Sequence, residues 1–306
     1  MDINQIYEAA NIMDIIHDPT APRLVINKDK VVNSNTVDGL EVYTKEIENG
    51  VSVELIVRKG KIIPKPVHLC FGITDEQAVQ YIIINAKIED NAEVSLLAHC
   101  VFPVAKDIVH KMDAEIFVGK NSKYSYFERH IHSETGGVKV IPKTKVKLDE
   151  NSRFKTEFEL IKGRVGSIDL DIEASCGDKS VVEMTTRISG TEDDKISIRE
   201  TGYLEGLNSR GALTSRIAVR NNSQAQVYNK LVATGSFSRG HVDCKEVVKD
   251  NAIASAVPIV EVKNPTAHIT HEASIGSVDL KQLETLMSRG LSEEEATELI
   301  IQGLLS

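Results

Sequence analysis

The chain has 306 residues, 41% hydrophobic and 26% charged, proportions typical of a folded protein with a large core rather than a disordered one. Its formal net charge of −9 is not offset by any concentrated basic stripe, which disfavours nucleic-acid binding, and no run approaches the ~18–20 apolar residues that span a membrane. The first residues lack the basic start and apolar core of a signal peptide, so we expect a cytoplasmic protein.

The first segment, residues 1–20, is predicted to contain a short amphipathic helix. Apolar residues recur at helical spacing between Ile3 and Ile16, and the run from Asp18 to Pro22 then breaks the pattern. The apolar positions are Ile6, Ala9, Ala10, Met13 and Ile16.

Residues 21–275 are predicted to form a long series of β-strands. Apolar residues alternate with other residues, which marks strands with one buried face. Clear examples are Val51, Val53, Leu55 and Val57, and Ile168, Leu170, Ile172 and Ala174. No convincing helical pattern interrupts the series, so a doubly wound fold with crossover helices is disfavoured.

A weak repeat of 30 residues runs through this region. Asn91, Asn121 and Asn151 each open a similar phrase, and Asn221 and Asn251 are again 30 residues apart. Asparagine tolerates left-handed turn geometry, so the repeat indicates a recurring corner and predicts a β-helix, or solenoid. A β-sandwich with chance spacing is the alternative. A solenoid reaches about 240 residues more easily, because each coil contacts only its neighbours.

Residues 276–306 change to a helical period and predict two short helices. Ser292 and Glu295 have the spacing of a capping box, and Gly290 follows Arg289 in the turn between the helices. The two apolar stripes are Leu280, Leu283, Leu286 and Met287, then Ala296, Leu299, Ile300 and Leu304. These helices could cap the core or present an apolar face to a partner.

Four dispersed cysteines form no CxxC pair, which disfavours a zinc knuckle and predicts buried free thiols: Cys70, Cys100, Cys176 and Cys244. Cys244 is the candidate exception. In a regular strand it shares a face with Val242, and Asp243 lies on the other face. It is either a small inward hydrophobe, or a thiolate ligand or sulfur acceptor whose pKa Lys245 and Lys249 could lower.

A second candidate group is His268, His271 and Glu272. In a regular strand His268 and Thr270 share one face, and His271 joins Ile269 on the other. These residues are not a metal motif by themselves, and they need ligands from another chain to become one. The alternative is two surface histidines and a solvated glutamate.

His130 and His132 also share one strand face. Two histidines at this spacing can bind zinc or iron. Because the sequence identifies no third ligand, we interpret them as a hydrogen-bonded polar face.

The motifs of several enzyme classes are missing. No phosphate-binding lysine loop, dinucleotide-binding glycine motif or serine-hydrolase elbow occurs, so we expect no enzyme of these classes and no nucleotide bound by the chain itself. A carbohydrate-active β-helix is disfavoured because aromatic residues make up only 5% and tryptophan is absent.

Four phrases in the last third of the chain resemble the SufB/SufD family of iron–sulfur cluster assembly scaffolds: residues 258–264, 271–273, 286–296 and 300–303. The resemblance is strong over about residues 236–306 and weaker, but consistent in its β pattern, over 40–235. The chain looks like the compact form found in archaea and some anaerobes.

The resemblance implies a right-handed parallel β-helix with flanking helices and a C-terminal segment that docks on a SufC-like ATPase. It also implies a homodimer paired through the β-helix ends, with a transient iron–sulfur cluster near the junction. Apo iron–sulfur proteins would receive the cluster. The implied role is that of a scaffold, not an enzyme. The alternative is a SufD-like structural subunit without its own cluster site.

The resemblance also implies a ligand set. His271 matches a histidine of both SufB and SufD, and Glu272 matches the glutamate that follows it in SufB, where SufD usually has glycine. The functional SufB cysteine falls on Asp243, one residue from Cys244, and a second cysteine falls on Ala252. Either a β-bulge brings Cys244 to the site, or Asp243 replaces the cysteine as an oxygen ligand. The predicted ligands are therefore Cys244 or Asp243, with His271 and Glu272.

Overall fold

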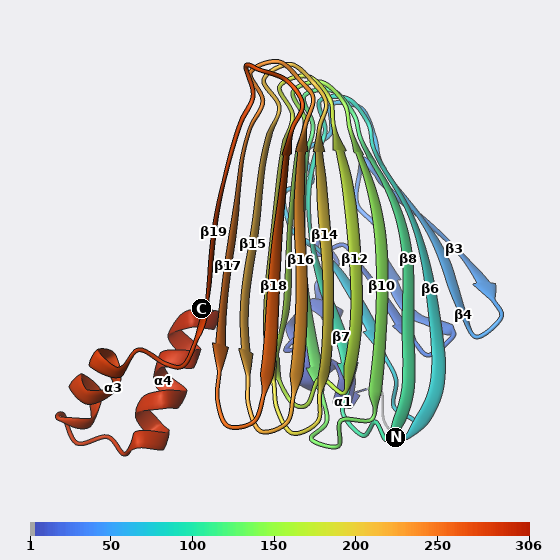
Figure 1. The fold of residues 1–306 in the computed structure, drawn as a ribbon. Coiled ribbons are helices and arrows are strands. Elements are labelled where there is room, and N and C mark those ends of the chain that lie inside the picture. Colours follow the sequence, from blue (N-terminus) through green and yellow to red (C-terminus); the bar gives the residue numbers. More distant parts are fainter. Residues whose placement is uncertain (1–3) are drawn as a thin grey trace.

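Two long sheets, formed by strands within residues 23–276, face each other (Figure 1). This is a computed structural model, and it describes residues 4–306. The chain forms a parallel β-solenoid of about eight turns, in which each turn adds one strand to each sheet. The predicted solenoid is confirmed, and the sandwich alternative is wrong because the chain passes from one sheet to the other in every coil.

The first sheet has ten strands, and the second has nine. In spatial order the first contains β19 (His268–Gly276), β17 (Arg239–Val248), β15 (Arg210–Val219), β13 (Val181–Gly190), β11 (Arg153–Lys162), β9 (Lys123–His132), β7 (Glu93–Phe102), β5 (Val67–Gly72), β1 (Arg23–Asn27) and β2 (Lys30–Asn35). The second contains β18 (Ile253–Val262), β16 (Gln224–Ala233), β14 (Lys195–Leu204), β12 (Ser167–Cys176), β10 (Val138–Leu148), β8 (Asp107–Val118), β6 (Gln77–Ile88), β4 (Gly50–Val57) and β3 (Leu40–Ile47). The β1–β2 and β3–β4 pairs are antiparallel, and the coils that follow pair in parallel.

The core lies between the two sheets and follows the alternation of each strand. In β12, Ile168, Leu170, Ile172 and Ala174 are buried, whereas Asp169 and Glu173 between them are exposed. The same inward rows in neighbouring coils stack on one another and form one continuous apolar core. A residue's place in the strand therefore decides whether it meets solvent or the interior.

The predicted asparagine corner is confirmed along one edge. Asn91, Asn121 and Asn151 have φ angles of 58°, 58° and 55°. The Asn121 amide donates to the Asn91 side-chain oxygen at 3.2 Å, and Asn151 donates to Asn121 at 2.8 Å. The same left-handed corner continues at Lys179, Asn208 and Phe237, of which only Asn208 is again an asparagine. An asparagine ladder thus ties three successive coils together.

The opposite edge has its own left-handed corners, and they include Asn221 with a φ of 57°. The next corner of this edge is Asp250, with a φ of 61°. The corner predicted at Asn251 is therefore one residue off. Asn221 and Asp250 do not continue the series of Asn91. They connect a strand of the first sheet to one of the second, whereas Asn91 connects the second sheet to the first.

The Asn121 corner leads to a prediction for stability. Asn121→Ala keeps a left-handed backbone that alanine disfavours and removes both ladder hydrogen bonds. We expect the free energy of unfolding to fall by about 1–2 kcal/mol. Asn121→Gly is the matched control, because glycine adopts this φ without steric cost and should lose less. Urea unfolding measures both, and equal losses would contradict a contribution from the left-handed backbone.

The N-terminal segment contains two short helices, α1 (Asn4–Ala9) and α2 (Met13–His17). The predicted helix over 3–16 is divided because Asn11 between them has a φ of 55°, which ends a right-handed helix. The predicted first residue, Ile3, lies outside the described residues.

The N-terminal helices cover the outer face of the first sheet. Ile6 and Ile12 are buried there against Cys70 and Val101. Met13, which the helical spacing assigned to the buried stripe, is 39% exposed, because the break in the helix turns Ile12 inward instead. These helices therefore shield part of the sheet far from the last coil.

The C-terminal segment contains α3 (Leu280–Met287) and α4 (Glu293–Leu305). The predicted capping box is confirmed: Ser292 accepts from the Glu295 amide, and the Glu295 side chain accepts from the Ser292 amide. In Figure 1 both helices stand beside the sheet at its β19 end. Across residues 4–306, no helix combines the length and apolarity needed to cross a membrane.

Candidate functional site

The four predicted ligands lie on the last two strands of the first sheet. Asp243 and Cys244 belong to β17, and His271 and Glu272 belong to β19. The two strands pair in parallel, with Val242 opposite His271 and Asp243 opposite Glu272. Residues in register point to the same face. Asp243 and Glu272 therefore share the outer face, and Cys244 and His271 share the inner one.

The register of β17 against its neighbours is unbroken over these residues, so no bulge turns Cys244 to the outer face. The bulge considered from the sequence is wrong. With strands spaced ~4.8 Å apart and a rise of ~3.3 Å per residue, the Cα atoms of Cys244 and His271 are about 8 Å apart. Their side chains can span that distance when both bind one metal centre.

Cys244 is a buried free thiol in this single chain. Burial raises its pKa to about 11. A hydrogen bond with Ser215 opposes the rise, and the charge of Glu246 adds to it. The prediction that Lys245 and Lys249 lower this pKa is wrong, because Lys245 lies on the outer face and is exposed. The thiol is therefore protonated at neutral pH until a metal displaces the proton.

A line of buried polar side chains leads inward from Cys244. The Asn229 amide lies 3.8 Å from the Cys244 Sγ. In the amide orientation that satisfies its neighbours, Asn229 donates to a Glu200 carboxyl oxygen at 3.2 Å. Thr186 donates to the other Glu200 oxygen at 2.7 Å. Polar groups are costly inside an apolar core, so this line marks the core near Cys244 as unusual.

Two carboxyl groups in this part of the core have raised pKa values. Burial raises the pKa of Glu200 to about 7, although the hydrogen bond from Thr186 acts to lower it. Burial also raises the pKa of Glu246 to about 7, against the hydrogen bond from Ser215, whose oxygen lies 3.2 Å away. Both groups can therefore take up or release a proton near neutral pH.

The outer-face candidates have a different environment. Asp243 forms an ion pair with Arg216, whose guanidinium also donates to the Asp243 carbonyl at 3.2 Å. The Oδ1 atom of Asp243 is buried and has no hydrogen-bond partner among the described residues, so a metal ion bound there would compete with Arg216 for the carboxylate charge. Glu272 and His271 are exposed, because β19 is the outermost strand of its sheet.

The last coil is incompletely covered. Its inward row continues the core but is only partly buried: Ala254, Ala256, Val260 and Ile269. Ile253 and Ile275 are exposed. Within residues 4–306, the chain places no element over this end of the core, and that is the usual condition of a surface that another chain covers.

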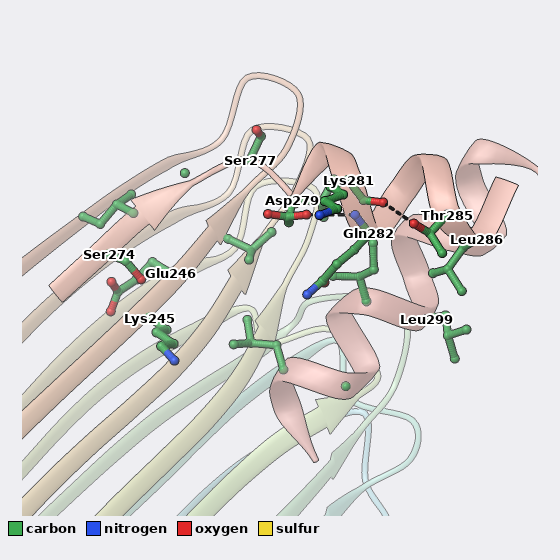
Figure 2. A pocket seen from close by; sticks show the side chains of 17 residues that line it. Lys245, Glu246, Ser274, Ser277, Asp279, Lys281, Gln282, Thr285, Leu286 and Leu299 are labelled. Carbon is green, nitrogen blue, oxygen red and sulfur yellow. Dashed lines mark hydrogen bonds between the residues drawn. The ribbon is translucent and has the colours of Figure 1, made fainter. Parts of the chain in front are cut away.

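A groove of about 1080 Å³ lies between the end of β19 and the two C-terminal helices (Figure 2). Figure 2 shows Lys281 and Gln282 of α3 and Leu299 of α4 around it. Of the two predicted stripes, Leu283 and Ala296 are buried, whereas Leu280 is 67% exposed and Leu299 is 48% exposed. The helices thus pack through one face, where Ile301 and Leu305 meet Ala218 of β15, and present another.

A second group of ligand-type residues lies deep in the N-terminal half of the core. The ligand atoms of Cys100, Glu128 and His130 all lie within 4.8 Å of one another. Strand spacing pairs His130 with His132 but identifies no third ligand. The missed signal was the alternation of Glu128, His130 and His132 on one strand face, and Cys100 joins them from the neighbouring strand β7.

Comparisons with known proteins identify relatives over most of the chain. The family model described as the SUF system FeS cluster assembly, SufBD core domain, matches residues 71–304. An iron–sulfur cluster assembly SufBD family protein of Pyrococcus horikoshii is 41% identical over 282 residues, which cover 92% of this chain and 86% of the relative. One of Methanocaldococcus jannaschii is 38% identical over 299 residues, covering 98% and 94%. One of Staphylococcus epidermidis is 25% identical, and the match covers 82% of this chain and 54% of the relative.

Proposed function

We propose that this chain, which belongs to the SufBD family of iron–sulfur cluster assembly proteins, is a homodimeric cytoplasmic scaffold that holds a nascent iron–sulfur cluster. It works with a SufC-like ATPase and passes the cluster to apo iron–sulfur proteins. It binds no nucleotide itself and catalyses no reaction of its own.

The observation that carries the proposal is the shared inner face of Cys244 and His271, on the last two strands of the first sheet beside the incompletely covered end of the core. One thiolate and one imidazole from each of two copies would supply four ligands across a two-fold junction. Mixed sulfur and nitrogen ligation is expected to hold a cluster less tightly than four thiolates, which suits a scaffold that must release it.

Cys244 is favoured over Asp243 as the ligand. Asp243 faces outward and is paired with Arg216, whereas Cys244 shares a face with His271. The Cys244 proton must leave when iron binds, and Glu200 lies one amide away with a pKa of about 7. Glu272 lies on the outer face, so it could bind the same cluster only if the end strand β19 rearranged.

The C-terminal helices support the ATPase partnership. Leu299 lines the groove and is exposed, Leu280 is exposed at the start of α3, and α4 is anchored to β15. An apolar, partly hollow surface on a firmly packed helix pair is suited to docking. ATP binding by the partner would then shift the two scaffold chains and open or close the junction between them.

The test is anaerobic reconstitution of the purified chain with iron and sulfide, read by visible absorbance, iron content and native mass. We expect a dimer that carries a cluster, loss of most of the cluster in Cys244→Ala, and retention in the control Asp243→Asn. A full complement of cluster in Cys244→Ala would reject the assignment and leave Asp243.

The alternative, a SufD-like subunit without its own cluster, is favoured by one observation: Cys244 is buried and its pKa is raised to about 11. Under this alternative the parent chain alone fails to reconstitute. It would then acquire a cluster only when a separate SufB-type subunit is present, so co-purification distinguishes the two.

A further inference from the structure

A buried polar cluster crosses the core between the two sheets in the N-terminal half. It joins Cys100 of β7 and Glu128 and His130 of β9, in the first sheet, to His110 of β8 in the second. All four side chains are almost completely buried. Such a group is costly in an apolar core unless its atoms bind one another or a metal ion.

Backbone carbonyls fix the orientation of His110. The Gln80 amide nitrogen donates to the carbonyls of Lys28 at 2.7 Å and Gly72 at 3.3 Å. Its oxygen therefore faces His110 Nδ1, at 2.9 Å, and that nitrogen carries the proton. The Nε2 atom of His110 is left as an acceptor, and it lies 3.8 Å from the Cys100 Sγ.

The same reasoning orients His130. The Arg164 carbonyl can only accept, so His132 Nδ1, 3.0 Å away, carries the proton. His132 Nε2 then accepts from His130 Nδ1 at 3.2 Å. His130 Nε2 consequently faces a Glu128 carboxyl oxygen at 2.7 Å. Two acceptors cannot approach so closely without a shared proton between them.

We propose that Cys100, Glu128, His130 and His110 form a buried binding site for one divalent transition metal ion of the zinc or ferrous class. The Nδ1 atoms of His110 and His130 are hydrogen-bonded to other side chains, as the second ring nitrogen of a metal-binding histidine usually is. The Nε2 atoms of both histidines point into the cluster. A cysteine, two histidines and a carboxylate are a ligand set that zinc and iron accept.

The ligand atoms of Cys100, Glu128 and His130 lie within 4.8 Å of one another, and the His110 Nε2 atom, which lies outside that group, would move toward them to complete a tetrahedral site. The Cys100 Sγ lies 3.6 Å from the Glu128 oxygen and 3.8 Å from His110 Nε2. Ligand atoms of a tetrahedral zinc site are roughly 3.5 Å apart, given bonds of about 2.0–2.3 Å. The 2.7 Å contact between Glu128 and His130 would lengthen when the ion replaces their shared proton.

Charge also balances. The ion would displace one proton from the Cys100 thiol and one from the Glu128–His130 pair. A divalent ion with one thiolate, one carboxylate and two neutral imidazoles is neutral overall, as the protonated cluster is. No net charge is brought into the core, which removes the main cost of burying an ion.

Room exists beside the ligands. A largely enclosed cavity of about 30 Å³ is lined by Tyr126 and by Glu128, but not by the other three proposed ligands. This volume is enough for a water-sized occupant. The buried Tyr126 hydroxyl faces Glu128 without a normal hydrogen bond to any described residue. A small movement of Glu128 toward the ion would use space that is already open.

This site is separate from the proposed cluster site. Glu128 and His130 on β9 are four strands from Cys244 on β17 in the same sheet. At ~4.8 Å per strand, the two sites are about 19 Å apart. An ion here would tie β7, β8 and β9 together across the core, whatever happens at the last coil.

The test uses Co²⁺, whose thiolate complexes absorb in the near ultraviolet. The full chain is refolded anaerobically with Co²⁺, because the ligands are enclosed, and free metal is removed. We expect one Co²⁺ per chain with a thiolate charge-transfer band. Retention should be at least tenfold weaker in Cys100→Ala and Glu128→Gln. Cys176→Ala, which removes another buried thiol, and Cys244→Ala should retain the ion.

Glu128→Gln keeps the shape of the side chain, and far-ultraviolet circular dichroism checks that it folds. Refolding with Zn²⁺ at about 100 times its Kd should raise the Tm of the parent chain by about 5 °C and leave that of Cys100→Ala unchanged. Equal metal content and Tm in the parent and Cys100→Ala would overturn the proposal. So would a charge-transfer band that disappears in Cys244→Ala but persists in Cys100→Ala.

Discussion

At pH 8, Glu200→Gln is expected to stabilise the chain: its free energy of unfolding should be about 3 kcal/mol higher than that of the parent chain. Glu200 is fully buried on β14, and burial raises its pKa from 4.5 to about 7. The folded chain therefore keeps a proton that the unfolded chain has already released. Glutamine has the shape of the protonated side chain and never ionises.

The sign and the pH window follow from the two pKa values. Between about pH 4.5 and pH 7, the unfolded state holds fewer protons at this site, so stability falls as pH rises. The fall is up to ~1.4 kcal/mol per pH unit, and it stops above the folded pKa. The gain from Glu200→Gln should therefore be small near pH 4.5 and largest above pH 7.

Urea unfolding at pH 4.5, 6 and 8 measures this dependence. Glu173→Gln is the matched control, because Glu173 is exposed on the neighbouring strand β12 and its replacement should change little at any of these pH values. A gain from Glu200→Gln that is equal at all three pH values would mean that packing, not the proton, is responsible.

The double variant Leu280→Asp with Leu299→Asp is expected to bind a SufC-like ATPase at least about 100-fold more weakly than the parent. Both side chains are largely exposed, Leu299 in the lining of the groove and Leu280 at the start of α3, next to the lining residue Lys281. Buried interface anchors commonly contribute 2 kcal/mol or more each, and a carboxylate in their place must also be desolvated.

The fold should survive these changes, because exposed positions outside the core rarely alter stability by more than about 0.5 kcal/mol. Ile62→Asp is the matched control, since Ile62 is 67% exposed near the other end of the solenoid, as Leu280 is at this end. Calorimetric titration with the purified ATPase gives the affinities. An unchanged Kd in the double variant would remove α3 and α4 from the interface.

The solenoid could be predicted because its geometry requires particular backbone conformations at regular positions in the sequence. Each coil needs a left-handed corner, and asparagine satisfies it at Asn91, Asn121 and Asn151. Where Lys179 and Phe237 occupy the same corner, the spacing leaves no signal in the sequence. The break at Asn11 was missed for the same reason: one left-handed residue divides a helix without disturbing its apolar period.

The candidate site could be predicted only in part. Period-two alternation correctly assigned Cys244 to the face of Val242. It could not show that Cys244 meets Asn229, because that contact depends on how two coils stack across the core. Nor could it pair Glu128 with Cys100, which lies 28 residues away on another strand. The register between distant strands depends on the length of every corner that separates them, so a local sequence pattern cannot predict it.

The incomplete last coil has a consequence for local opening of the chain. Every inner coil is stabilised by a neighbour on each side, whereas β19 has a strand neighbour on one side only. In a stacked array the terminal unit has the smallest opening free energy, so it separates while the rest stays folded. Opening of β19 alone would carry His271 away from Cys244. Because one proposed ligand lies on an inner strand and the other on an edge strand, the pair could separate and release a bound cluster while the rest of the protein stays folded.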